Sequence, residues 1–257
     1  MTDLDIVTYG FSMTSDQGGL GWSSVSLLKV ADKNILVDTG PSGRRGLLVN
    51  ALKAKGLTPD EIDTVILTHL HWDHCQNVDL FPDASILVHP KEIDYNKNPN
   101  TYDYNASYAV ASMLETMKVT PISDGDKITE EITIIDTPGH TLGHLSVQVQ
   151  IDEDRVLIAG DAMPDAATIE RKLPYNVFFD VKQATESVER MVDSSNVFYP
   201  GHDRPFRLDQ VNGGGVQYLH GPTQVEVFAS NDGANIAPSM TYNVQSIRKP
   251  NIDLVQQ

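Results

Sequence analysis

Four side chains of metal-binding type follow directly after a short apolar segment. This feature limits the possible folds and functions of the chain more than any other. The segment Thr64–Thr68 reads Thr-Val-Ile-Leu-Thr, which is typical of a strand buried on both faces. His69 and His71 come next and project toward the same face if the strand continues, while Asp73 and His74 follow in a turn or helix start. Histidine and carboxylate are ligands of zinc and related metals, so we expect a metal site at this strand end.

Three further candidate ligands lie at the ends of later strands. His140, Asp161 and His202 each come shortly after a predicted strand and beside a glycine, where the backbone can approach a site closely. The strands in question are Ile132–Asp136, Val156–Ala159 and Val197–Tyr199. This repeated placement adds the three residues to the first four candidates.

The pattern of apolar and turn residues in the rest of the sequence predicts strands followed by a helix in each half of the chain. Ser24–Val30 and Asn34–Val37 resemble a hairpin, and Arg44–Lys55 has helical spacing of its apolar residues. Thr58-Pro59-Asp60-Glu61 resembles a helix capping box. We further expect strands at Ser85–Val88 and Leu145–Ile151, and helices at Ser107–Lys118 and Val181–Val192. Two sheets packed together under outer helices are consistent with this order.

The string His69-x-His71-x-Asp73-His74, with the later His140, Asp161 and His202, resembles the metallo-β-lactamase superfamily. Leu36-Val37-Asp38-Thr39-Gly40 also matches that family, and the resemblance runs from about residue 20 to about residue 205. It implies a mixed α/β fold, the four-layer αββα sandwich, with the metal site at the sheet edge. We therefore expect one domain over residues 1–257, with its core at about 20–205 and a C-terminal extension at 206–257.

The resemblance also implies a ligand set for two divalent ions, most simply zinc, with iron, manganese or cobalt as alternatives. Three histidines hold one ion, an aspartate and two histidines hold the other, and Asp161 bridges them. The first group is His69, His71 and His140, and the second is Asp73, His74 and His202. A pair of ions roughly 3.5–4 Å apart supplies a bridging hydroxide near neutral pH, which makes the chain a metal-dependent hydrolase. Asp73 is a candidate catalytic residue that orients the hydroxide.

Within the superfamily, the compact length and the segment from Gly139 to His144 look most similar to the quorum-quenching N-acyl homoserine lactonases. This implies hydrolysis of a carboxylic ester, foremost a lactone. Those enzymes typically carry a tyrosine three residues after the bridging aspartate, where this chain has Pro164. Tyr175 is the nearest downstream tyrosine, and it either replaces the missing group as a second candidate catalytic residue or packs in the interior.

Two other activities remain open at this stage. A glyoxalase II-like enzyme, which hydrolyses a glutathione thioester, shares all the ligands but adds a helical C-terminal region with basic groups. Here the residues after His202 are glycine-rich at Gly213-Gly214-Gly215 and strand-like, with basic residues only late, at Arg248 and Lys249. A persulfide dioxygenase-like oxidoreductase would use the same ligand types for a single iron.

Several residues near the ligands have two interpretations. Asp38 lies at a strand end, where it either holds a ligand imidazole by its outer N–H or caps a turn. We expect His144 to be a buried, hydrogen-bonded histidine instead of a ligand. The segments expected to line the site are Gly10–Trp22, Asn96–Ser107 and Ala162–Phe179. The middle one is either a lid or an irregular connection.

Charge and composition limit the classes of molecule that the protein is expected to bind. Acidic side chains outnumber basic ones by 35 to 19, a net charge of -16 that disfavours nucleic acid and acidic membrane surfaces. We thus expect a small-molecule ester or lactone substrate, with no nucleic acid or membrane partner, and a homodimer stays possible. The first residues lack the pattern of a signal peptide and no long apolar stretch occurs, which favours a cytoplasmic protein. The single cysteine, Cys75, excludes an intrachain disulfide.

Overall fold

Two mixed sheets of six strands each dominate the computed structural model, which describes residues 2–15, 18–209, 215–227, 230–231, 235–236 and 240–243. The first sheet has the order β1-β4-β5-β6-β7-β8 and the second the order β14-β13-β12-β11-β10-β9. The strands of the first are β1 (Thr2–Thr8), β4 (Val25–Val30), β5 (Lys33–Val37), β6 (Thr64–Ile66), β7 (Ser85–Val88) and β8 (Val119–Pro121). Those of the second are β9 (Ile132–Asp136), β10 (Leu145–Ile151), β11 (Asp154–Gly160), β12 (Val197–Pro200), β13 (Phe206–Asp209) and β14 (Gly215–Tyr218).

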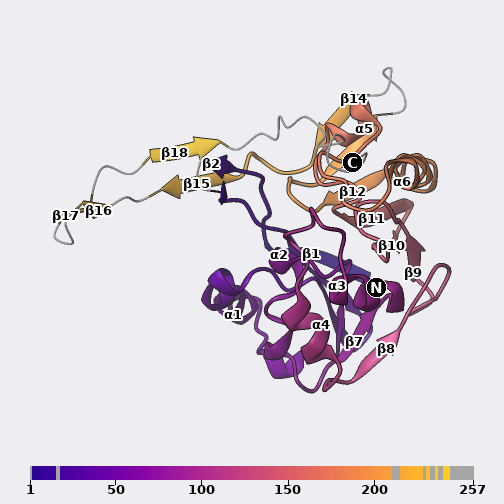
Figure 1. Cartoon of the computed structure of the whole chain (residues 1–257), viewed down its shortest axis with the longest axis horizontal. Helices are drawn as coiled ribbons and strands as arrows, with labels where there is room; N and C mark the ends of the chain where they lie inside the picture. Colours follow the sequence, from indigo (N-terminus) through magenta and orange to yellow (C-terminus); the bar gives the residue numbers. More distant parts are fainter. Residues whose placement is uncertain are drawn as a thin grey trace.

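The helices cover the outer faces of the two sheets, so that the layers run helix, sheet, sheet, helix (Figure 1). With the first sheet lie α1 (Arg45–Ala54), α2 (Trp72–Cys75), α3 (Pro90–Lys97) and α4 (Tyr108–Leu114). With the second lie α5 (Thr168–Arg171) and α6 (Val181–Ser194). Short 3-10 turns occur at η1 (Ser42–Arg44), η2 (Pro59–Glu61) and η3 (Val78–Leu80). The predicted mixed α/β sandwich is therefore confirmed.

Each central strand is apolar on both faces because each face meets a different layer. Val65 of β6 packs under the first-half helices, in a cluster with Leu52 of α1 and Leu114 of α4. Its neighbour Ile66 points the other way and packs between the sheets, in a cluster with Ile134 of β9. This alternation accounts for the continuous apolar runs that predicted strands buried on both faces.

Most predicted elements are confirmed, with small shifts at their ends. The hairpin is β4–β5, and Thr58 and Glu61 form the expected capping box at η2. The helix predicted at Ser107–Lys118 is shorter and ends at Leu114. The strand β1 was not predicted. Nor was α3, which begins at Pro90 because proline is well suited to the first position of a helix.

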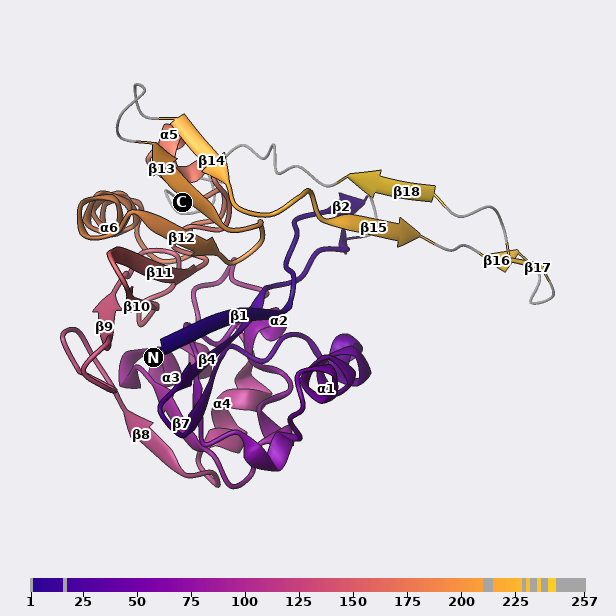
Figure 2. The same cartoon turned by 180° about the vertical axis from the view of Figure 1, so that it is seen from behind.

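The chain after His202 first completes the second sheet and then leaves the sandwich. The strands β13 and β14 extend the sheet edge: β13 pairs antiparallel with β12, and β14 pairs antiparallel with β13. Beyond them, β15 (Gln224–Val227) pairs with β18 (Met240–Asn243), and β16 (Ser230–Asn231) pairs with β17 (Asn235–Ile236). Figure 2 shows these paired strands projecting away from the two sheets, near the hairpin of β2 (Thr14–Ser15) and β3 (Gly18–Gly19). Gly213, Gly214, Arg248 and Lys249 lie outside the described residues.

None of the helices in the described part of the chain is long and apolar enough to cross a membrane.

Gly139 offers a test of how closely the turn after β9 packs on the start of α6. A Cβ atom at Gly139 would lie 2.2 Å from the backbone nitrogen of Ala184, and its φ of +125° disfavours any side chain. We expect Gly139→Ala to lower the free energy of unfolding by about 3 kcal/mol, since overpacking and backbone strain add. Gly46→Ala is the matched control: it lies in α1 with no atom within 4 Å and should stabilise by about 0.5–1 kcal/mol. Urea unfolding of both variants checks this, and equal midpoints would contradict it.

Candidate metal centre

The chain leaves β6 at one end of the first sheet, and this brings the first four candidate ligands together there. After β6 the chain bends at Thr68, and His71, which is extended with φ -70° and ψ 148°, precedes the first turn of α2. Asp73 and His74 then lie within that turn, where both are buried. Strand followed by one helical turn is thus the local structure that gathers these side chains.

The other three candidates come from the second sheet. His140 lies in the turn between β9 and β10, whereas Asp161 follows β11 and His202 follows β12. Because β11 and β12 are parallel neighbours, Asp161 and His202 meet at the same sheet edge. Gly201 makes this approach possible, since a Cβ atom there would lie 2.1 Å from Oδ1 of Asp161.

All seven predicted ligands come together, in two adjacent groups. His69, His71, His140 and Asp161 form one group, and Asp73, His74 and His202 form the other; within each, the ligand atoms lie within 4.8 Å of one another. In the first group Nε2 of His140 is 3.0 Å from Nδ1 of His71. In the second, Nε2 of His202 is 3.4 Å from Oδ2 of Asp73.

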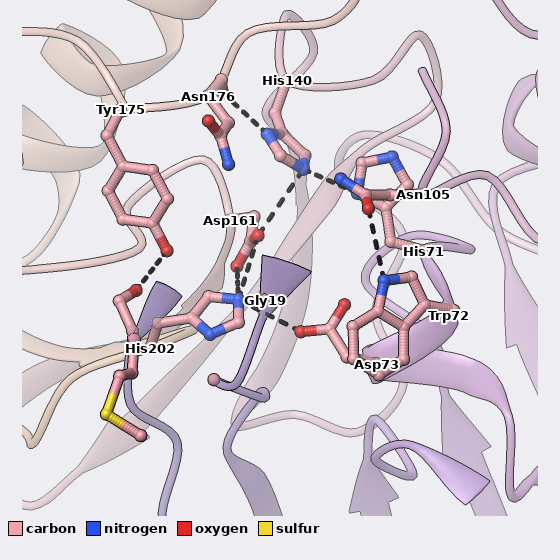
Figure 3. Close-up of a pocket in the computed structure, with 13 residues that line it drawn as sticks. Gly19, His71, Trp72, Asp73, Asn105, His140, Asp161, Tyr175, Asn176 and His202 are labelled. Carbon is pink, nitrogen blue, oxygen red and sulfur yellow. Dashed lines mark hydrogen bonds and ion pairs between the residues drawn. The ribbon is translucent and has the colours of Figure 1, made fainter. Parts of the chain in front are cut away.

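Asp161 lies where the two groups meet. Its Oδ2 is 3.6 Å from Nε2 of His140 in the first group and 3.2 Å from Nε2 of His202 in the second. Its Oδ1 is 3.3 Å from Nε2 of His74 and 3.2 Å from Nε2 of His202 in the second. Figure 3 shows the carboxylate between His140 and His202, with Asp73 facing His202 from the other side.

For three of the five histidines, an outer hydrogen bond determines which ring nitrogen faces the centre. His71 donates from Nε2 to Oδ2 of Asp103 (3.1 Å), and His74 donates from Nδ1 to Oδ2 of Asp38 (2.8 Å). His140 donates from Nδ1 to the carbonyl oxygen of Asn176 (2.8 Å). In each ring the other nitrogen keeps its lone pair and points into the cluster, as metal-binding histidines require.

Two of the three histidines of the first group have a lowered pKa, whereas the pKa of His71, which burial alone would lower, is raised by the facing carboxylate of Asp103. The pKa of His69 lies well below its ordinary value because the ring is fully buried and lies beside His74 and His71. Burial and His71 likewise lower the pKa of His140 to about 4. Burial alone would raise the pKa of Asp161, but the facing imidazoles of His202 and His74 hold it well below its usual range.

The arrangement fits a divalent metal centre. Nε2 of His69, Nε2 of His74 and Oδ1 of Asp161 are buried without a hydrogen-bond partner, which is costly unless another species satisfies them. Inward-facing imidazole nitrogens and carboxylate oxygens are a donor set for zinc and related borderline metals. These residues can therefore hold divalent metal ions.

Two interpretations left open by the sequence are now resolved. Asp38 accepts a hydrogen bond from the candidate ligand His74, as described, and also from the backbone N–H and the hydroxyl of Thr68. His144 is buried and is not among the grouped ligands: its Nδ1 contacts the hydroxyl of Thr137, and its Nε2 accepts from the backbone N–H of Asp161. His144 thus positions the backbone that carries the shared carboxylate.

Glu92 of α3 is a buried carboxylate that the sequence analysis missed. Its Oε1 accepts from the backbone N–H of Leu70 (3.1 Å) and from Nδ2 of Asn96 (2.9 Å). Its Oε2 accepts from the hydroxyl of Thr141 (2.8 Å) and the backbone N–H of Gly143 (2.9 Å). Leu70 separates His69 from His71, and Thr141 directly follows His140, so this one carboxylate joins the ligand-bearing loops of both halves.

Asp103 is a second residue that sequence reasoning missed. It is buried in the segment Asn96–Ser107 and accepts from the hydroxyl of Tyr95 (2.8 Å) as well as from His71. The neighbouring backbone is bonded to the ligand string, with Trp72 N–H donating to the carbonyl of Asn105. The segment is therefore an irregular connection fastened to the centre. The high Asn and Tyr content of this segment was the only feature of the sequence that pointed to a role near the site.

A small cavity of about 100 Å³ opens over the two ligand groups. Each of the three segments predicted to line the site contributes, for example through Ser12, Asn105 and Tyr175. The Tyr175 hydroxyl lies 2.5 Å from Oγ of Ser12, and the tyrosine ring centre is 6.4 Å from that of His202. Pro164 has a structural role instead: its backbone carbonyl accepts a hydrogen bond from the backbone N–H of His202 (2.8 Å). Among the described residues that line the cavity, none is a lysine or an arginine.

Replacement of Glu92 tests its function as a support of the first ligand group. In Glu92→Gln one acceptor oxygen becomes an NH₂ group that faces two donors, so we expect stability to fall by roughly 1–3 kcal/mol. Zinc affinity should fall roughly 10- to 100-fold, the usual effect of losing an outer support. Competition with a chromogenic chelator measures the affinity, and the exposed Glu130→Gln is the control. Parent-like zinc affinity in Glu92→Gln would refute the assignment.

Comparison with known proteins agrees with this geometry. The sequence profile of the family described as "Metallo-beta-lactamase superfamily" matches residues 18–202. A probable metallo-hydrolase of Methanocaldococcus jannaschii is 32% identical over 170 residues, which are 66% of this chain and 70% of that protein. An N-acyl homoserine lactonase of a Bacillus species is 27% identical over 162 residues, 61% of this chain and 62% of that protein.

Solved structures show the same fold. A variant of the Bacillus thuringiensis protein AiiA, crystallised with N-decanoyl-L-homoserine at its active site, superimposes with a TM-score of 0.64. It is 23% identical in sequence, and the match covers 77% of this chain and 92% of that one.

Proposed function

Because the chain belongs to the metallo-beta-lactamase superfamily and is a metal-dependent hydrolase, we propose that it hydrolyses a lactone at a centre of two divalent metal ions. The observation that carries the proposal is the position of Asp161, whose carboxylate contacts histidines of both ligand groups. An anionic carboxylate between two cation sites compensates charge at both. In this proposal zinc is the expected metal, held by His69, His71 and His140 on one side and by Asp73, His74 and His202 on the other.

Metal ions bound there supply an activated water and polarise the ester carbonyl. The chain's own residues orient the reactants. Asp73 presents a buried carboxylate at the cavity wall, where it accepts a hydrogen bond from the attacking water and holds its orientation. The hydroxyl of Tyr175 is held near the cavity by its hydrogen bond with Ser12 and donates to the carbonyl oxygen of the substrate. Tyr175 thereby takes the role of the lactonase tyrosine, whose position is occupied by Pro164 in this chain.

An uncharged ester suits the cavity better than a glutathione thioester. Glutathione carries two carboxylates, and a site that selects it needs cationic side chains, which the described cavity wall lacks. The net charge of -16 further weakens the encounter with anions. The similarity to N-acyl homoserine lactonases supports the choice of a lactone.

A substrate panel tests the reaction class. With the zinc-loaded protein, we expect kcat/KM for N-hexanoyl homoserine lactone to exceed that for S-lactoylglutathione by at least roughly tenfold, about 1.4 kcal/mol in the transition state. Tyr175→Phe should lower lactone turnover by roughly 10- to 100-fold through loss of a donor to the carbonyl oxygen. Tyr104→Phe is the control, since Tyr104 is 84% exposed. A preference for the thioester would overturn the proposal.

Metal content tests the two-ion centre. Elemental analysis should find two ions per chain in the parent and fewer in Asp161→Asn, because an amide cannot compensate two cations. Lactone turnover of Asp161→Asn should fall at least roughly 100-fold, while its circular dichroism spectrum stays that of the parent. The exposed Asp193→Asn serves as the control. Two ions and parental turnover in Asp161→Asn would show that this carboxylate is not shared.

A further inference from the structure

A second cavity, larger than the one over the ligand groups, lies beside the end of β1 and the residues that follow it. It measures about 550 Å³, within the range of roughly 300–1,000 Å³ typical of small-molecule sites. Its walls are the end of β1, the start of α1 and the segment that enters β15. In both views that segment runs beside the chain that follows β1 (Figure 1 and Figure 2). None of the described residues that line it belongs to the two ligand groups.

Arg44 supplies the only charge of fixed sign among the described residues of this wall. Its guanidinium donates to the backbone carbonyl of Tyr9 (3.1 Å) and lies 5.4 Å from the ring centre of Trp22. No described carboxylate lies within ion-pair distance of it. Burial lowers the pKa of Arg44 to about 10, which shows that water solvates the cation incompletely.

Two other arginines of this chain, which has 35 acidic against 19 basic side chains, are each paired with a carboxylate. The next residue, Arg45, binds Asp79 through two hydrogen bonds of 2.8 and 3.0 Å. Arg207 is held in the same way by Asp154. A partly buried guanidinium that is left unpaired costs free energy, and a carboxylate is the anion whose two oxygens match its planar shape.

The rest of the wall is largely apolar. Phe11 and Val7 form its buried part, whereas Leu47 of α1 is 49% exposed. Val225 and Pro222 contribute from the segment at β15. His220, also in this wall, is hydrogen-bonded through Nδ1 to the hydroxyl of Tyr9 (2.8 Å). A ligand that satisfies both parts has one anionic group and a hydrocarbon body, and the net charge of -16 favours a single negative charge over several.

We propose that this cavity binds a small aliphatic monocarboxylate, whose carboxylate pairs with Arg44 and whose hydrocarbon part packs on Leu47, Phe11 and Val225. The site is separate from the metal centre and does not depend on the proposed lactonase activity. Phe11 adjoins Ser12, so the two cavities share one segment of backbone.

Calorimetric titration of the zinc-loaded protein with decanoate tests the proposal. We expect one molecule to bind per chain, and decanamide, which is neutral, to bind at least tenfold more weakly. Arg44→Met should weaken decanoate binding at least tenfold and leave decanamide binding nearly unchanged. Arg45→Met is the matched control, because it removes an adjacent arginine that is already paired, and it should bind decanoate like the parent.

A second variant guards against an indirect effect of Arg44→Met on the fold. Leu47→Asp changes an exposed position of α1, so it should keep the parental unfolding midpoint while it loses decanoate binding. Equal affinity of the parent and Arg44→Met for decanoate would overturn the proposal. So would loss of binding when the zinc is chelated, because the carboxylate would then be bound at the metal centre.

Discussion

The hydrogen bonds received by one buried carboxylate hold the two halves of this molecule together at the point where their ligands meet. Glu92 comes from a helix on the outer face of the first sheet, yet its oxygens accept from Leu70 in the first half and from Thr141 and Gly143 in the second. Burial raises the pKa of Glu92, and these donors act in the opposite direction. A loop that moved away would leave a buried carboxylate partly unsatisfied, which costs several kcal/mol. Movement of either loop alone is therefore opposed.

The close approach of the histidines is unfavourable by itself. Rings that would repel one another when protonated, such as those of His71 and His140, lie with nitrogens 3.0 Å apart. Their outer nitrogens are bound by Asp103 and by the carbonyl of Asn176, so they cannot turn away without losing those bonds. The fold thus keeps the nitrogen and oxygen donors close together, in position to bind a cation. Any metal ion that binds these donors stabilises the folded state by mass action.

Features that depend on short stretches of chain were predictable from the sequence. The strand at Thr64–Thr68, the capping box at Thr58 and the helix at Arg44–Lys55 each follow from local periodicity or turn chemistry. The helix α3 was missed because only Pro90 signalled its start within a stretch that otherwise resembles the end of a strand. Glu92 and Asp103 were missed for another reason: their partners lie about 20 to 50 residues away along the chain, at Leu70, His71 and Thr141.

By itself the sequence determined the seven candidate ligands, the strands that carry them and, through resemblance, their division into two groups. Residue type and spacing suffice for this, because strands and tight turns repeat over a few residues. Only the tertiary structure decided that Asp161 faces both groups, that Glu92 and Asp103 support them, and that no carboxylate in the described part of the chain pairs with Arg44. These relations depend on the order of strands in two sheets and on how closely the sheets pack, and neither is encoded in the spacing of residues along the chain.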